Sequence, residues 1–210
     1  MMNVLLITGW GVGTAPLKPL KHALEQYFTV ELVDPYDDLT HQAQMADLLI
    51  GWSLGGQIAI ELGVKLHKKV ITLASNPCFV QNTHWQTAMP QMQFEAFKQG
   101  YLTHPEKTLK QFYLNVCKGQ SNPKACWQQL LEIANPPSDE KLKKGLQQLE
   151  QLNLVEQAKQ LDALHIHAEY DTLVPRSIHQ QQFNNVGHAF CVFEVEKTVQ
   201  AILMYLAMAS

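Results

Sequence analysis

Short apolar runs alternate with helical patterns along the first 80 residues of the chain. Runs of β-branched and aliphatic side chains predict strands, and apolar residues at helical spacing predict helices between them. The predicted strands cover residues 4–8, 29–33, 47–52 and 70–74, and the predicted helices cover 16–28, 39–45 and 58–66. Strands that alternate with helices predict a parallel sheet with right-handed crossovers.

The pattern changes between residues 81 and 157, where strand signals vanish and Gln, Lys and Leu recur at helical spacing. This periodicity predicts helices over 91–101, 105–117, 123–133 and 139–152. Ser138 is the expected N-cap of the last of them. Beyond this region, a strand over 164–170 and an amphipathic helix over 195–208 complete the pattern. We therefore expect an α/β core made of residues 1–80 and 158–210, with residues 81–157 inserted as a helical lid.

The segment Gly51-Trp52-Ser53-Leu54-Gly55 lies where a predicted strand meets a predicted helix. Gly-x-Ser-x-Gly in this setting is typical of a nucleophile elbow, a strained turn that exposes the serine hydroxyl. Such a turn requires residues almost without side chains two positions before and after the serine, and glycines stand at both. The motif predicts that Ser53 is a nucleophile. The alternative is a glycine-rich turn without a catalytic role.

A serine hydroxyl is a poor nucleophile unless a histidine removes its proton and an acid orients that histidine. Asp171 follows a predicted strand, and His188 follows Gly187 in a loop shortly before the last helix. The order Ser, Asp, His is the order of this hydrolase type. We therefore predict Asp171 and His188 as the other catalytic residues. A turn aspartate and a packed core histidine are the alternatives.

The catalytic set also needs two backbone N–H groups that face the developing oxyanion. Leu54 supplies one by the geometry of the elbow, and Trp10, in the loop after the first strand, is the candidate for the second. Trp10 is also a candidate for the wall of the substrate pocket, together with Phe79 and Phe112. A dinucleotide-binding reading of the same loop fails, because Thr14 stands where the third glycine is required.

The composition of the chain argues against nucleic acids and membranes as binding partners. The net charge is −3 and no basic run is present, which argues against nucleic acid. No segment approaches membrane-spanning length, so we expect no membrane association. The four cysteines show no metal-ligand spacing and the chain shows no export signal, which suggests reduced thiols in a cytoplasmic protein.

We also expect no metal and no cofactor. His165 and His167 alternate along a predicted strand and share one face, but two imidazoles without a third ligand make a poor metal site. The other histidines are interpreted as polar surface residues, among them His84, His104 and His179.

Charge is distributed unevenly between the expected lid and core. Residues 81–160 carry nine lysines and seven acidic residues, whereas the remainder carries seven basic and twelve acidic residues. Two lysine pairs have the spacing that places both side chains on one helix face, namely Lys107 with Lys110 and Lys141 with Lys144. Docking of an acidic protein partner on the lid is therefore a hypothesis, with a solvated face as the alternative.

Together these residues resemble the pimeloyl-[acyl-carrier protein] methyl ester esterases, within the α/β-hydrolase superfamily. The resemblance lies in Gly9-Trp10-Gly11, in Gly51 to Gly56, in the run Thr72 to Phe79, in Asp171 with Leu173 to Arg176, and in Gly187-His188-Ala189. It implies a serine hydrolase that removes the methyl group from a pimeloyl chain carried on acyl-carrier protein. The lid would dock the acidic carrier.

The chain departs from that family in lacking the N-terminal antiparallel strands and in having Asp171 and His188 only seventeen positions apart. We therefore expect a reduced, mainly parallel sheet of about five or six strands, and we expect a monomer. Two other functions stay open at this point. One is a general short-chain carboxylesterase or thioesterase, and the other is a non-catalytic binding module with a hydrolase fold.

Overall fold

The computed structural model describes residues 1–175 and 181–208 of the chain. Arg176 and His179, which the sequence analysis names, lie outside the described residues. The strands are β1 Asn3–Ile7, β2 Thr29–Val33, β3 Leu48–Trp52, β4 Lys69–Leu73, β5 Ala163–Ala168 and β6 Gln181–Phe183. The helices outside the region between β4 and β5 are the 3₁₀ turn η1 Ala15–Leu17, α1 Lys18–Leu24, α2 Thr40–Met45, α3 Leu54–Leu66, α9 Phe190–Phe193 and α10 Val195–Met208.

The six strands form one parallel sheet in the order β2-β1-β3-β4-β5-β6. The reduced parallel sheet predicted from the sequence is therefore confirmed. β6 was not predicted, and it pairs with β5 through Gln181 to Phe183. The predicted helix over 16–28 is shorter than expected, because α1 ends at Leu24.

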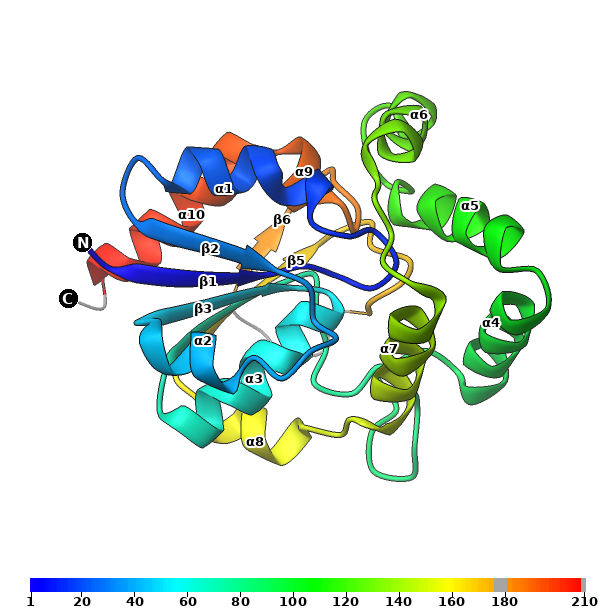
Figure 1. Cartoon of the computed structure of the whole chain (residues 1–210), viewed down its shortest axis with the longest axis horizontal. Coiled ribbons are helices and arrows are strands. Elements are labelled where there is room, and N and C mark those ends of the chain that lie inside the picture. The colour runs from blue at the N-terminus through cyan, green and yellow to red at the C-terminus, as the bar shows by residue number, and fades with distance from the viewer. Residues whose placement is uncertain (176–180, 209–210) are drawn as a thin grey trace.

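Helices cover both faces of the sheet (Figure 1). α1, α9 and α10 lie on one face and α2, α3 and α8 (Val155–Gln160) on the other. Successive side chains of β1 point to opposite faces of the sheet. Val4 and Leu6 belong to the apolar cluster on one face, and Leu5 and Ile7 belong to the cluster on the other. Both faces are thus buried, as a parallel sheet requires.

Four helices between β4 and β5 extend beyond the carboxyl ends of the strands (Figure 1). They are α4 Gln91–Thr103, α5 Pro105–Val116, α6 Pro123–Ile133 and α7 Asp139–Gln151, and they match the predicted helices to within about two residues. The side chain of Ser138 caps α7 by accepting a hydrogen bond from the N–H of Lys141, as predicted. We refer to α4–α7 as the lid; the boundaries 81–157 stay a prediction. None of the helices in the described residues is both long and apolar enough to cross a membrane.

The lid shares a third apolar cluster with the segments that follow the first five strands, β1 to β5. Trp10, Tyr36 and Leu54 contribute to it from the core, and Tyr101 and Leu146 contribute from the lid. The lid is therefore packed directly against the edge of the sheet where the predicted functional residues lie.

Candidate active site

Ser53 occupies a strained turn between β3 and α3. Its φ of 56° and ψ of −120° are unfavourable for a residue with a side chain, and such strain is concentrated at functional sites. Three hydrogen bonds hold the turn: the N–H of Ser53 donates to Leu73 over 2.9 Å, and the carbonyl of Ser53 accepts from Gly56 N–H at 2.9 Å and from the Ser75 hydroxyl at 2.7 Å.

The flanking glycines are required by the close approach of backbone atoms. A Cβ at Gly51 would lie 2.1 Å from the carbonyl oxygen of Gly55, and a Cβ at Gly55 would lie 2.3 Å from the carbonyl oxygen of Ile7. No rotation of a neighbouring side chain could relieve these contacts, because both partners are main-chain atoms. The spacing of the motif thus follows from the shape of the turn.

His188 and Asp171 form a buried pair. Nδ1 of His188 lies 2.8 Å from Oδ2 of Asp171, and each side chain is only 2% exposed. The other carboxylate oxygen, Oδ1, accepts hydrogen bonds from the N–H groups of Leu173 and Val174 at 2.9 Å each. The carboxylate is therefore fixed in the turn after β5, and it directs one ring nitrogen of His188 toward itself.

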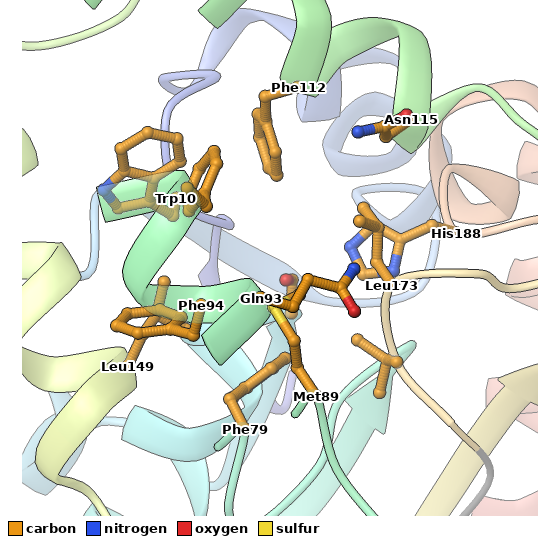
Figure 2. Close-up of a pocket in the computed structure, with 13 residues that line it drawn as sticks. Trp10, Phe79, Met89, Gln93, Phe94, Phe112, Asn115, Leu149, Leu173 and His188 are labelled. Atoms are coloured by element: carbon orange, nitrogen blue, oxygen red, sulfur yellow. The ribbon is translucent and has the colours of Figure 1, made fainter. Parts of the chain in front are cut away.

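Ser53 and His188 line the same cavity, which has a volume of about 210 Å³. Figure 2 shows His188 at one side of this cavity and Trp10, Phe94 and Phe112 around the others. The described lining residues are Trp10, Ser53, Phe79, Met89, Gln93, Phe94, Phe97, Phe112, Asn115, Leu149, Leu173, Val174 and His188. The pocket is apolar, and apart from His188 these residues include no ionisable acid or base.

All three residues predicted to bind substrate, Trp10, Phe79 and Phe112, line this pocket. Gln93 and Asn115 are its amide side chains, and the sequence analysis did not identify them. They stand on α4 and α5, where the helical pattern does not distinguish a pocket residue from a surface residue. Their amides can donate and accept hydrogen bonds within an otherwise apolar space.

The loop between β1 and η1 carries Trp10, and several fixed contacts hold it. The indole Nε1 of Trp10 donates to the carbonyl of Leu142 in α7 over 2.8 Å. The N–H of Gly11 donates to the Tyr36 hydroxyl at 2.9 Å, and the Tyr113 hydroxyl donates to the carbonyl of Gly11 at 2.6 Å. Neither tyrosine was identified from the sequence.

The two predicted lysine pairs have different surroundings. Lys141 Nζ lies 2.5 Å from Oδ2 of Asp37, and Lys144 donates to the carbonyl of Tyr36, so both bind α7 to the loop after β2. Lys107 and Lys110 are exposed on α5, where they line a surface groove with Trp127. Lys107 and Lys110 thus face solvent at this groove, whereas Lys141 and Lys144 contact the core.

His165 and His167 are buried on β5, and Nδ1 of His165 lies 2.7 Å from the hydroxyl of Thr72. Burial, with a further contribution from His167, lowers the pKa of His165 to about 4. All four cysteines are free thiols.

No family model matches the chain. It is 29% identical to a pimeloyl-[acyl-carrier protein] methyl ester esterase from Shewanella sp. (strain MR-7), over 98% of this chain and 90% of that protein. A protein of the same name from Shewanella woodyi is 27% identical, over 89% of this chain and 82% of its own length. The structure is similar to that of an esterase from Exiguobacterium antarcticum, with a TM-score of 0.80 and 18% identity, over 99% of this chain and 92% of that one.

Proposed function

Because the chain is a hydrolase with the α/β-hydrolase fold and resembles the pimeloyl-[acyl-carrier protein] methyl ester esterases, we propose that it hydrolyses the methyl ester of pimeloyl-[acyl-carrier protein]. The products are methanol and pimeloyl-[acyl-carrier protein], a precursor of biotin. The observation that supports the proposal is the buried His188–Asp171 pair, whose histidine lines one apolar cavity with the strained Ser53. We further propose that the enzyme is a cytoplasmic monomer.

The proposed chemistry has two steps with one tetrahedral intermediate each. Nε2 of His188 takes the proton of the Ser53 hydroxyl as Oγ attacks the ester carbonyl, and Asp171 stabilises the imidazolium that forms. His188 then protonates the departing methoxide, which leaves as methanol. Water, deprotonated by His188, then attacks the acyl carbon of the acyl-enzyme. As the bond from that carbon to Ser53 Oγ breaks, His188 returns the proton to Oγ and the carboxylic acid is released.

The amides of Trp10 and Leu54 are proposed to donate to the oxyanion in both intermediates. Leu54 is the first residue of α3, so its N–H also lies at the positive end of that helix. Trp10 lines the cavity and lies in the loop that the lid holds.

The lining of the cavity supports an uncharged acyl terminus as substrate. Burial of an ionised carboxylate without a cation is costly, whereas a methyl ester is neutral and fits an apolar wall. The free acid formed by hydrolysis would be unfavourable in the same space, which promotes release of the product. The exposed lysines on α5 offer complementary charge to an acidic carrier protein.

A general short-chain carboxylesterase or thioesterase is the second candidate, since the cavity of about 210 Å³ accommodates small acyl groups of many kinds. Parallel assays with carrier-linked pimeloyl methyl ester and with free methyl pimelate separate the two. We expect a kcat/KM for the carrier-linked ester at least about tenfold above that for free methyl pimelate; equal values would favour the general esterase.

The nucleophile is tested with Ser53→Ala, which should lower kcat on both substrates by at least about 10³-fold. Ser121→Ala is the matched control, because Ser121 is exposed in the segment before α6 and should leave kcat unchanged. A fluorophosphonate probe should label the native chain and not Ser53→Ala. Retained esterase activity in Ser53→Ala would refute the assignment.

A further inference from the structure

The loop proposed to supply an oxyanion donor is held by hydroxyl groups from two separate parts of the chain. Tyr36 lies in the segment after β2, and Tyr113 lies on α5 of the lid. Their hydroxyls bind the two polar groups of one residue: Gly11 N–H donates to Tyr36, and Tyr113 donates to the Gly11 carbonyl. Gly11 directly follows Trp10, so these bonds fix the two peptide planes that follow the one carrying the proposed donor.

The hydroxyl groups of both tyrosines are buried and stay protonated. Tyr36 is fully buried and Tyr113 is 4% exposed, so neither hydroxyl exchanges its partner for bulk water. Burial raises the pKa of Tyr113 to about 12, and burial also raises the pKa of Tyr36 well above its usual value. Both groups therefore stay protonated at neutral pH and keep these hydrogen bonds.

Further lid groups hold the same loop. The Trp10 indole donates to the Leu142 carbonyl and packs edge-on against Phe97 and Phe112, with ring centroids 5.3 and 5.0 Å away. Asn135, between α6 and α7, donates its N–H to the Val12 carbonyl at 3.0 Å. Figure 2 shows Trp10 and Phe112 side by side at the pocket wall.

One hydrogen bond within the loop, from the Thr8 hydroxyl to the Gly13 carbonyl over 2.8 Å, holds this shape only in part. Gly11 and Gly13 have φ of 80° and 71°. Because glycine has no side chain, these two residues could adopt many other backbone conformations if the neighbouring contacts were absent. A Cβ at Gly13 would lie 2.1 Å from the carbonyl oxygen of Asn135, which shows how closely the lid approaches. External hydrogen bonds are thus needed to select one conformation of a glycine-rich loop.

We propose that Tyr36 and Tyr113 are positioning residues that hold the Trp10–Gly11 backbone so that the Trp10 amide is directed at the oxyanion, and that the lid thereby completes the catalytic machinery. This inference rests on the proposed serine-hydrolase mechanism. Preorganised donors contribute to catalysis because they need no rearrangement as charge develops. A displacement of the donor by less than 1 Å lowers kcat without changing the apolar contacts that bind substrate.

The test is the kinetics of Tyr36→Phe and Tyr113→Phe on a short aryl ester, which reports on the chemistry without carrier docking. Each variant keeps its ring and loses one hydroxyl. We expect kcat to fall about tenfold in each, with KM within about twofold of the native value. The Ki of a trifluoromethyl ketone, whose adduct with Ser53 carries an oxyanion, should rise by the same factor as kcat falls.

Tyr101→Phe is the matched control. Tyr101 is a buried lid tyrosine whose ring packs against Trp10 at 5.5 Å, but its hydroxyl donates to Asp139 and not to the loop. It should keep native kcat and ketone affinity. The midpoint of urea unfolding is measured for each variant. The kinetics are then compared under conditions in which all variants are folded.

The inference is overturned if both tyrosine variants keep kcat and ketone affinity within twofold, or if Tyr101→Phe loses as much as they do. It is separable from the proposed function. An inactive Ser53→Ala combined with unaffected tyrosine variants refutes the positioning role alone, whereas an active Ser53→Ala refutes the mechanism on which it rests.

Discussion

The indole Nε1 of Trp52 donates a hydrogen bond to the backbone carbonyl of His188 over 3.1 Å. The residue before the proposed nucleophile thus binds the loop that carries the proposed base. The two rings also lie close together, with centroids 5.7 Å apart. The relative position of β3 and the loop before α9 therefore does not depend on the catalytic side chains alone.

Trp52→Phe should lower kcat about tenfold, because the ring packing is largely retained while the hydrogen bond to the His188 loop is lost. KM for a short aryl ester should change by less than about twofold. Trp127→Phe is the control, since its indole donates to Lys110 on the lid surface, away from the cavity. Steady-state kinetics that show equal losses in both variants would contradict a specific role for Trp52.

Asp171→Asn should reduce kcat by about 10³- to 10⁴-fold while the fold is retained. The amide keeps an acceptor for the N–H groups of Leu173 and Val174, but its NH₂ cannot accept from Nδ1 of His188, so the imidazole is left in the wrong tautomer. Steady-state kinetics and the urea midpoint measure the two effects. Asp162→Asn is the control, because Asp162 is exposed and accepts a hydrogen bond only from Tyr205 among the described residues; its kcat should stay within twofold of the native value. If Asp171→Asn also kept kcat within twofold, Asp171 would not be a catalytic residue.

The stability of the protein should fall on mild acidification because of His165. Its pKa is about 4 in the folded chain and about 6.5 when unfolded, so between these values the unfolded state binds more protons. The contribution is therefore fully present above about pH 6.5 and is lost as pH falls toward 4. About 1.4 kcal/mol per unit of pKa gives a loss of about 3 kcal/mol in the free energy of unfolding.

Urea unfolding at pH 7.5 and pH 4.5 measures this loss, with His165→Gln as the comparison. The glutamine retains a polar partner for the Thr72 hydroxyl but cannot be protonated. The difference in unfolding free energy between the two pH values should shrink in the variant. An unchanged difference would assign the acid sensitivity to other groups.

Charge reversal should separate the two lysine pairs of the lid. Lys107→Glu with Lys110→Glu should raise KM for the carrier-linked ester several-fold and leave the short aryl ester unaffected, because these side chains contact solvent on α5. Lys141→Glu with Lys144→Glu should instead lower stability, because the contacts with Asp37 and with the Tyr36 carbonyl are lost. Equal effects of the first pair on both substrates would refute docking at the α5 groove.

The sequence predicted the sheet and the lid helices because strong local signals mark them. Pro105 and Pro123 stand at the first turn of α5 and α6, and Asn122 caps α6 through a hydrogen bond from Ala125 N–H. β6 was missed because Gln-Gln-Phe is too short and too polar for a strand pattern. α9 was missed for a similar reason, since four residues are too few for a helical period to be recognised, and α8 at the end of the insertion was missed although the equally short α2 was predicted.

The proposed catalytic residues were identified from motif and chain order, and the structure brings Ser53 and His188 to one cavity and His188 to Asp171. Their roles stay predictions. The supporting contacts were invisible in the sequence, since Tyr36 and Tyr113 stand 25 and 102 positions from Gly11. Long-range pairs of this kind leave no periodic or spacing signal, and only the folded arrangement reveals them.

The contacts between Asn135 and the Gly13 segment bear on how such enzymes can be re-engineered. A lid is commonly regarded as an exchangeable cover that tunes specificity. In this chain a transplanted lid would arrive without the carbonyl, amide and hydroxyl groups that hold residues 9–15. A chimera would therefore gain a new pocket wall at the expense of turnover, unless the donor lid carries a tyrosine and an asparagine at equivalent places.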